Sequence, residues 1–191
     1  RKLLGNGNVY IFKSDFQGRC DSIAYNTADS VIHFYKKPIL WSQNYQLEAD
    51  SISAFMENNQ INRMFLRGKA FIIAEDSLVK QFNQIKGRTI NAFFQEKNAL
   101  RQVLVDGNGE SAYYALGDDQ KFFGLNRVLC GKMNILFKEG RVNRIAFIGK
   151  PDGKLIPPHE ITPALRQLDG FSWRVADKPD LATTTWKNTG R

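Results

Sequence analysis

The fold is decided by two segments that follow each other in the chain: Leu47-Glu-Ala-Asp-Ser-Ile-Ser-Ala54 and Ile61-Asn-Arg-Met-Phe-Leu-Arg-Gly68. Segments like the first recur at 18–25, 85–92 and 128–135, and segments like the second at 100–107 and 142–149. In three copies, 19, 20 and 19 residues separate the small residue of the first segment from the glycine ending the second. This regular spacing indicates an internal repeat.

Polar stretches at 26–29, 57–60, 95–98 and 138–141 separate the two kinds of segment. They are typical of hairpin turns, so each unit is predicted to be a strand, a tight turn and a return strand. Within the first strand the apolar alternation changes phase: Leu47 and Ala49 share one parity, and Ile52 and Ala54 share the other. Such a shift predicts a bulge or corner. We therefore expect an all-β fold of antiparallel strand pairs, creased at the same place in every unit.

The side of the crease that carries the apolar residues is the predicted interior. On the return strands it comprises Ile32, Phe34, Met64, Leu66, Val103, Val105, Ile145 and Phe147, and on the outgoing strands Leu47, Ile52, Ile85, Ile90, Val128 and Met133. From the residues alone, this interior is either a packed core or an apolar slot.

Charge and composition narrow the range of partners. The formal net charge is +8, which attracts acidic partners such as anionic lipids, but the basic residues are spread out and match no nucleic-acid-binding motif. No apolar run approaches the ~18 residues of a membrane span. The repeat is already under way near Gly5-Asn-Gly7, so we expect the parent protein to continue upstream.

Several longer runs carry a family resemblance: Asp15-Phe-Gln-Gly-Arg-Cys-Asp-Ser22, Phe34-Tyr-Lys-Lys-Pro-Ile-Leu-Trp41, Gln46-Leu-Glu-Ala-Asp50, Phe82-Asn-Gln-Ile-Lys-Gly87 and Ile156-Pro-Pro-His-Glu160. Over about residues 5–174 the chain resembles the OstA-like, LptA-type periplasmic lipopolysaccharide-transport proteins. The resemblance implies an open, V-shaped β-jellyroll over residues 1–156. After Ile156 the chain leaves the repeat, and Pro157, Pro158, Pro163 and Pro179 break regular structure. For residues 157–191 we therefore expect a short irregular or helical cap, at 160–168, and a loosely held end at 175–191.

The resemblance also implies a function. Lipopolysaccharide acyl chains would bind the fourteen interior positions, and the protein would pass the lipid across the periplasm to the outer membrane. Units would stack by their edge strands on each other or on other transport components. No cofactor and no catalytic step would be involved. A basic rim would contact the lipid phosphates. Its candidates are Lys36, Lys37, Arg63, Arg67, Lys69, Arg144 and Lys150.

Other chemistry is weakly represented in the sequence. Cys20 and Cys130 occupy the same phase in the first and fourth copies, too many strands apart for a disulfide, so two separate buried thiols are expected. His33 and His159 have no partners at metal-ligand spacing.

Two alternative functions stay open. One is a structural or adhesive β-stack with a sealed core, and the other is a polysaccharide-acting enzyme using Asp21, Asp50 and Asp106.

Overall fold

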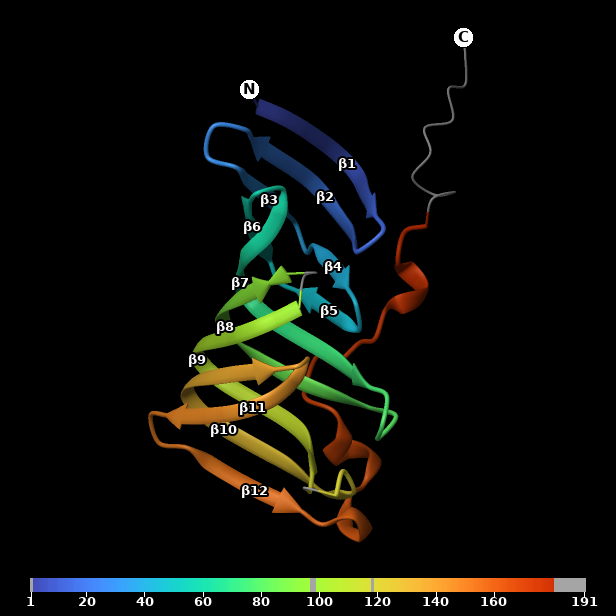
Figure 1. Ribbon diagram of the computed structural model, residues 1–191, viewed down its shortest axis with the longest axis vertical. Helices are drawn as coiled ribbons and strands as arrows, with labels where there is room; N and C mark the ends of the chain where they lie inside the picture. Colours follow the sequence, from blue (N-terminus) through green and yellow to red (C-terminus); the bar gives the residue numbers. More distant parts are fainter. Residues whose placement is uncertain (1, 97–98, 118, 181–191) are drawn as a thin grey trace.

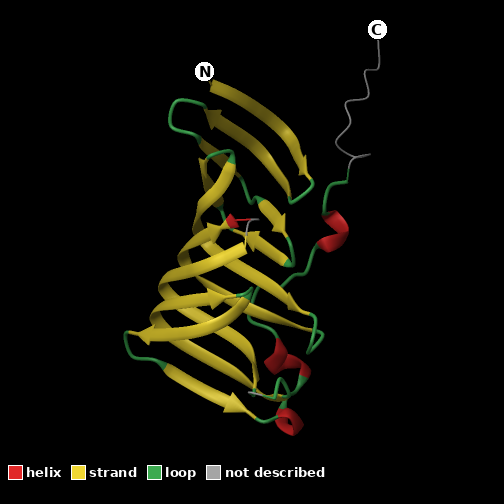
Figure 2. Cartoon of the chain, in the orientation of Figure 1, coloured by secondary structure: helices red, strands yellow, loops and turns green. Residues whose placement is uncertain are grey.

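The computed structural model describes residues 2–96, 99–117 and 119–180. Strands dominate this part of the chain, and three single-turn 3-10 helices follow them (Figure 2). The elements are β1 (Lys2–Lys13), β2 (Phe16–Asn26), β3 (Val31–Tyr35), β4 (Ile39–Ser42), β5 (Tyr45–Glu48), β6 (Ser51–Glu57), β7 (Gln60–Asp76), β8 (Gln81–Gln95), β9 (Ala99–Leu116), β10 (Phe122–Lys138), β11 (Arg141–Ile148), β12 (Asp152–Ile156), η2 (Pro158–Glu160), η3 (Pro163–Arg166) and η4 (Val175–Asp177).

The strands form a single antiparallel sheet, which confirms the predicted all-β class. Successive passes of the chain lie side by side, from β1 at one end of the molecule to β11 and β12 at the other (Figure 1). The predicted turns at 26–29, 57–60 and 138–141 connect β2 to β3, β6 to β7 and β10 to β11. The turn predicted at 95–98 lies partly outside the described residues.

The prediction of an open jellyroll is wrong for the first half of the sheet. Hydrogen bonding runs from β7 through β5, β4, β2, β3 and β6 and returns to β7, so these six strands form a closed barrel. The barrel closes because two passes of the chain are interrupted. The break at 36–38 separates β3 from β4, which both pair with β2, and the break at 49–50 separates β5 from β6, which both pair with β7. The ladder then continues outside the barrel from β7 through β8 and β9 to β10, β11 and β12.

The predicted crease is present in the long strands. The register shifts between Asn6 and Val9, between Arg67 and Ala70 and between Cys130 and Lys132, and the shift of β8 against β9 lies at 86–89. Bulges of this kind bend a strand and increase its twist. The bend needs glycine in β7 because Gly68 has a φ of 73°, and a Cβ there would also collide with the Asp50 carboxyl group.

The crease divides the sheet into two layers. The first layer consists of β3, β6 and β11 together with the segments 22–26, 60–67, 89–95, 99–106 and 132–138. The second layer consists of β4, β5 and β12 together with the segments 16–19, 71–76, 81–86, 110–116 and 122–129. The main apolar core contains buried residues of both layers, such as Met64 and Leu66 of the first and Leu47 and Ile72 of the second. The interior therefore lies between the layers.

The outer face of the second layer is covered by the C-terminal segment 157–180, which we call the strap. It leaves β12 at Ile156 and runs back along the side of the sheet toward the N-terminal strands (Figure 1). A helix or cap was expected at 160–168; the structure has only the single turns η2 and η3 there. Of the expected loose tail at 175–191, residues 181–191 lie outside the described residues, and 175–180 include η4.

Candidate functional site

The interior positions predicted from the repeat face the space between the layers. Nine of them are buried members of the main core: Phe34, Leu47, Ile52, Met64, Leu66, Ile90, Val103, Val105 and Met133. Four are half-buried and pack against it: Ile32, Ile85, Ile145 and Phe147. Val128 is buried but belongs to neither apolar cluster, although its register places it on the same face as Cys130. The repeat thus identified the inward-facing rows correctly.

These rows run straight across the sheet because the strand register is continuous within each layer. In the first layer, Leu66 of β7 pairs with Ile90 of β8, which pairs with Val105 of β9, which pairs with Met133 of β10. Phe147 of β11 ends the row opposite Met133. Since side chains alternate along a strand, one matched residue per strand gives a continuous apolar strip perpendicular to the strands.

A cavity of about 230 Å³ opens between the layers where the barrel strands β5 and β7 meet the strands β8–β11. Its apolar wall is formed by side chains from both layers, Ile72 and Ile85 of the second and Leu100, Ile135 and Ile145 of the first. For comparison, an apolar cavity of ~150 Å³ is large enough to bind benzene. The space is therefore large enough for part of an apolar chain.

The mouth of the cavity lies at the strand ends farthest from the crease, and it is polar. β7 contributes its last residue, Asp76, β9 contributes Tyr113, and β11 contributes its first residue, Arg141. Burial raises the pKa of the Tyr113 hydroxyl; the Asp76 charge raises it further and the Arg141 charge opposes the shift. Asp76 and Arg141 thus act on one side chain from the two layers, which places opposite charges around the opening.

The residues expected to form a phosphate-binding rim lie away from this mouth. Lys36, Lys37, Lys69 and Lys150 are exposed and have φ values of 60°, 58°, 48° and 55° at the corners where the chain bends. They therefore line the outside of the crease. Lys36 Nζ lies 2.8 Å from an Asp21 carboxylate oxygen, and this hydrogen bond lowers the pKa of Asp21.

The arginines of the same set lie on the outer face of the first layer. The Arg63 guanidinium stacks 3.9 Å from the centre of the Phe55 ring, and the Arg67 guanidinium lies 5.3 Å from that of Phe65. Arg144 is exposed on β11, opposite Leu136 of β10. Arginine stacked on phenylalanine covers apolar ring surface while its N–H groups stay in water.

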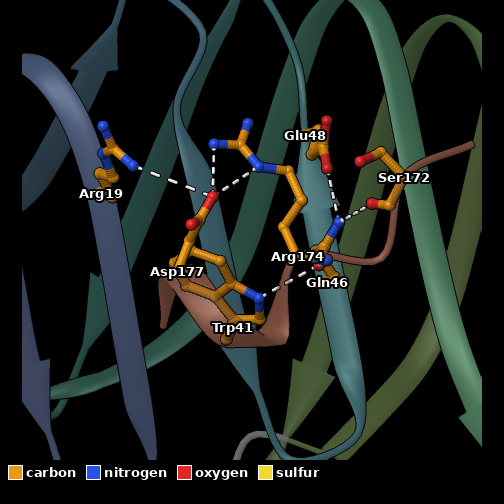
Figure 3. Close-up of polar contacts among 7 residues, drawn as sticks. All are labelled: Arg19, Trp41, Gln46, Glu48, Ser172, Arg174 and Asp177. Atoms are coloured by element: carbon orange, nitrogen blue, oxygen red, sulfur yellow. Dashed lines mark hydrogen bonds and ion pairs between the residues drawn. The ribbon is translucent and has the colours of Figure 1, made fainter. Parts of the chain in front are cut away.

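The strap was missed by the sequence reasoning, and it is held by two buried glutamines. Gln46 of β5 donates to the Ser172 carbonyl at 2.6 Å, and its own carbonyl oxygen accepts from the Arg174 N–H at 2.7 Å and the Trp41 indole at 3.2 Å (Figure 3). Near the end of the strap, the Asp177 carboxylate accepts from the Arg174 guanidinium.

Gln84 of β8 repeats this arrangement farther along the strap. Its amide donates to the Arg166 carbonyl at 2.7 Å, and its carbonyl oxygen accepts from the Leu168 N–H at 2.8 Å. Beneath the strap, a second apolar cluster includes Phe71 and Ile73. The sequence indicates this covered face by the unbroken apolar run 70–74. A strand whose odd-numbered and even-numbered residues are all apolar is buried on both faces.

Two of the three carboxylates considered for an enzymatic reading, Asp21 and Asp106, are far apart. Asp21 lies on β2 and Asp106 on β9, separated by the passes that contain β3–β4, β5–β6, β7 and β8. At ~4.8 Å per strand this separation is ~24 Å, well beyond the ~5–10 Å of a glycosidase pair. Each is paired with a lysine instead, Asp21 with Lys36 at 2.8 Å and Asp106 with Lys132 at 2.9 Å.

The cysteines and histidines have ordinary surroundings. Cys20 and Cys130 are separate, buried thiols, as expected, and burial raises the pKa of Cys20 to about 11. His33 lies 2.9 Å from the Ser53 hydroxyl, and His159 lies 3.5 Å from Glu160. Within residues 2–96, 99–117 and 119–180, no group of three or more His, Cys, Asp or Glu side chains could hold a metal ion.

Comparison with known proteins does not assign the chain to a family: no family model matches it, and no curated protein matches it. In the described part of the chain, no helix is both long enough and apolar enough to cross a membrane. Functional conclusions therefore rest on the interior and its opening.

Proposed function

We propose that this chain is a lipopolysaccharide-transport module of the OstA-like kind. It would hold lipid acyl chains between its two layers and pass them across the periplasm toward the outer membrane, without catalysis and without a cofactor. The observation that carries the proposal is the cavity of about 230 Å³, which has an apolar wall and a polar mouth. Burying each methylene group of an acyl chain there contributes ~0.8 kcal/mol.

The family's open jellyroll is proposed only for the part of the sheet beyond the barrel. Inside the barrel the interior is filled by side chains such as Phe34 and Leu66, which are 1% and 0% exposed. Toward β11 the inward-facing Ile145 and Phe147 are only half-buried. An acyl chain would therefore enter between the layers at β8–β11 and extend toward the barrel.

The two ends of the sheet support the proposed assembly with other modules. Among the described strands, β1 pairs with β2 alone, and β11 and β12 pair with β10 alone. Both ends therefore present backbone groups that another strand could pair with. Apolar side chains are exposed there, with Leu4 at 70% on β1 and Ile148 at 53% on β11. Partners would be a second copy of the chain or another transport component.

Site-specific photo-crosslinking to lipopolysaccharide tests the proposal. The probe is placed at the half-buried positions Ile85, Phe137 and Ile145, which line the cavity. Matched controls are placed at Arg101 and Arg144, which are exposed on the outer face of the first layer. We expect adducts at the cavity positions and none at the controls.

The rival function is a structural or adhesive stack with a sealed core, and the closed barrel is the observation that favours it. A sealed core predicts that the folded protein gives no adduct at the cavity positions, just as at the controls. Probes at Phe34 and Leu66 add a second readout: adducts there would show that lipid reaches the interior of the barrel.

A further inference from the structure

Two buried polar atoms in the second layer have no hydrogen-bond partner within the described part of the chain. They are the Ser111 hydroxyl oxygen of β9 and the Asn126 side-chain carbonyl oxygen of β10. Ser111 is only 2% exposed. Leaving such a group unpaired is unfavourable, and most buried polar groups in proteins are paired. The pair therefore needs an explanation.

Both side chains face the space between the layers. Ser111 pairs with Ile85 on one side and with Val128 on the other, so it sits in an inward-facing row. Asn126 lies on the same face of β10 as Val128 and Cys130, because the register is unbroken over that stretch and side chains alternate. As residues on adjacent strands, offset by two positions, Ser111 and Asn126 are diagonal neighbours, typically ~7–8 Å apart.

Ser111 lies between the apolar part of the cavity and its polar mouth, and Asn126 is its diagonal neighbour on β10. Ser111 itself lines the cavity, as do Ile85 beside it and Tyr113 two residues farther along β9. Asn126 pairs directly with Tyr113, the residue on which the Asp76 and Arg141 charges act. A chain entering at the mouth would pass Tyr113 before it reached Ser111.

We propose that Ser111 and Asn126 form a subsite that recognises a hydroxyl group on the acyl chain of a bound amphiphile. This inference rests on the proposed lipid-binding function. A hydroxyl on the ligand can donate to the Asn126 carbonyl oxygen and accept from the Ser111 hydroxyl, whereas a methylene at that point satisfies neither. An otherwise apolar slot with one such polar pair selects hydroxylated over unsubstituted chains.

The test compares ligands that differ only by the hydroxyl. Dissociation constants are measured by displacement of a fluorescent fatty acid. The ligand pairs are tetradecanoic acid with 3-hydroxytetradecanoic acid, and octadecanoic acid with 12-hydroxyoctadecanoic acid. At least one hydroxylated acid should bind about tenfold tighter than its unsubstituted partner. Ser111→Ala and Asn126→Leu should each reduce the preference below about threefold, while Ser51→Ala and Asn91→Leu, on the outer face, should leave it unchanged.

The outcomes separate this inference from the function on which it rests. Equal affinity of the wild-type protein for both members of each pair would overturn the subsite and leave lipid binding standing. Retention of the preference in folded Ser111→Ala and Asn126→Leu would also overturn the subsite, because other residues would then recognise the hydroxyl. Failure to bind any of the acids would count against lipid binding itself. The wild-type comparison does not depend on whether any variant folds.

Discussion

Replacing Gln84 with alanine should release the strap, and the structure sets the size of the effect. Gln84 is 1% exposed and bridges β8 to the strap through Arg166 and Leu168. In Gln84→Ala the Arg166 carbonyl and the buried Leu168 N–H lose their partners, at ~1–3 kcal/mol for each group that stays buried. We expect the free energy of unfolding to fall by about 2–4 kcal/mol.

Urea unfolding followed by tryptophan fluorescence measures this loss, because Trp173 of the strap packs 5.0 Å from the Phe82 ring of β8. Limited proteolysis should cleave the strap faster in the variant. The matched control is Gln102→Ala, since Gln102 makes a single side-chain bond, to Asn134, on the first layer's outer face. The control should change stability by less than about 0.5 kcal/mol. A Gln84→Ala protein as stable as the control would refute the reasoning.

Three further predictions concern the crease and its neighbours. Gly68→Ala should lower the free energy of unfolding by about 2–4 kcal/mol, and Gly140→Ala should lower it by only about 1–2 kcal/mol. Both glycines have a positive φ, but only Gly68 has another side chain packed against it. Equal losses of stability in urea unfolding would contradict this reasoning. The Cys20 thiol, whose pKa is raised to about 11, should react with iodoacetamide at pH 8 about 100-fold more slowly in the folded than in the unfolded protein, and comparable rates would contradict its burial. Lys36→Ala should raise the pKa of Asp21 toward its usual value in an NMR titration. Because the folded pKa is the lower one, this pair stabilises the fold above the unfolded pKa, and that contribution is lost as pH falls through the folded pKa.

The repeat predicted the inward-facing rows because local alternation and spacing carry that information. Leu66, Val105 and Phe147 each lie two residues before the glycine that ends their segment, and the phase change at the small residue marks the crease. Bulges follow from local backbone conformation, so a sequence pattern can locate them. The separation of the two thiols followed from the same counting of strands.

Features that depend on contacts between distant segments could not be predicted in this way. The barrel closes because the chain breaks at 36–38 and 49–50. The phase change after Ala49 predicts a bend, but it does not distinguish a bulge within one strand from a break between two strands. The strap is joined to β5 and β8 by Gln46 and Gln84, which look like surface residues until a segment more than 80 positions away covers them. The cavity mouth combines the turns at 76–80 and 138–141, whose distance apart is set by how far the layers diverge.

The strap gives the second layer a source of stability that does not depend on the interior. Phe71 and Ile73 point outward and pack under the strap, while Ile72 between them faces the cavity. The layer is thus held from outside by burial of apolar surface and by the bonds of Gln46 and Gln84. Because its position does not require a filled interior, the sheet would stay intact if the proposed slot gained or lost an acyl chain. Under the proposed function, weakening the strap should therefore reduce the affinity for a fluorescent fatty acid as well as stability, although Gln84 makes its strap contacts on the outer face.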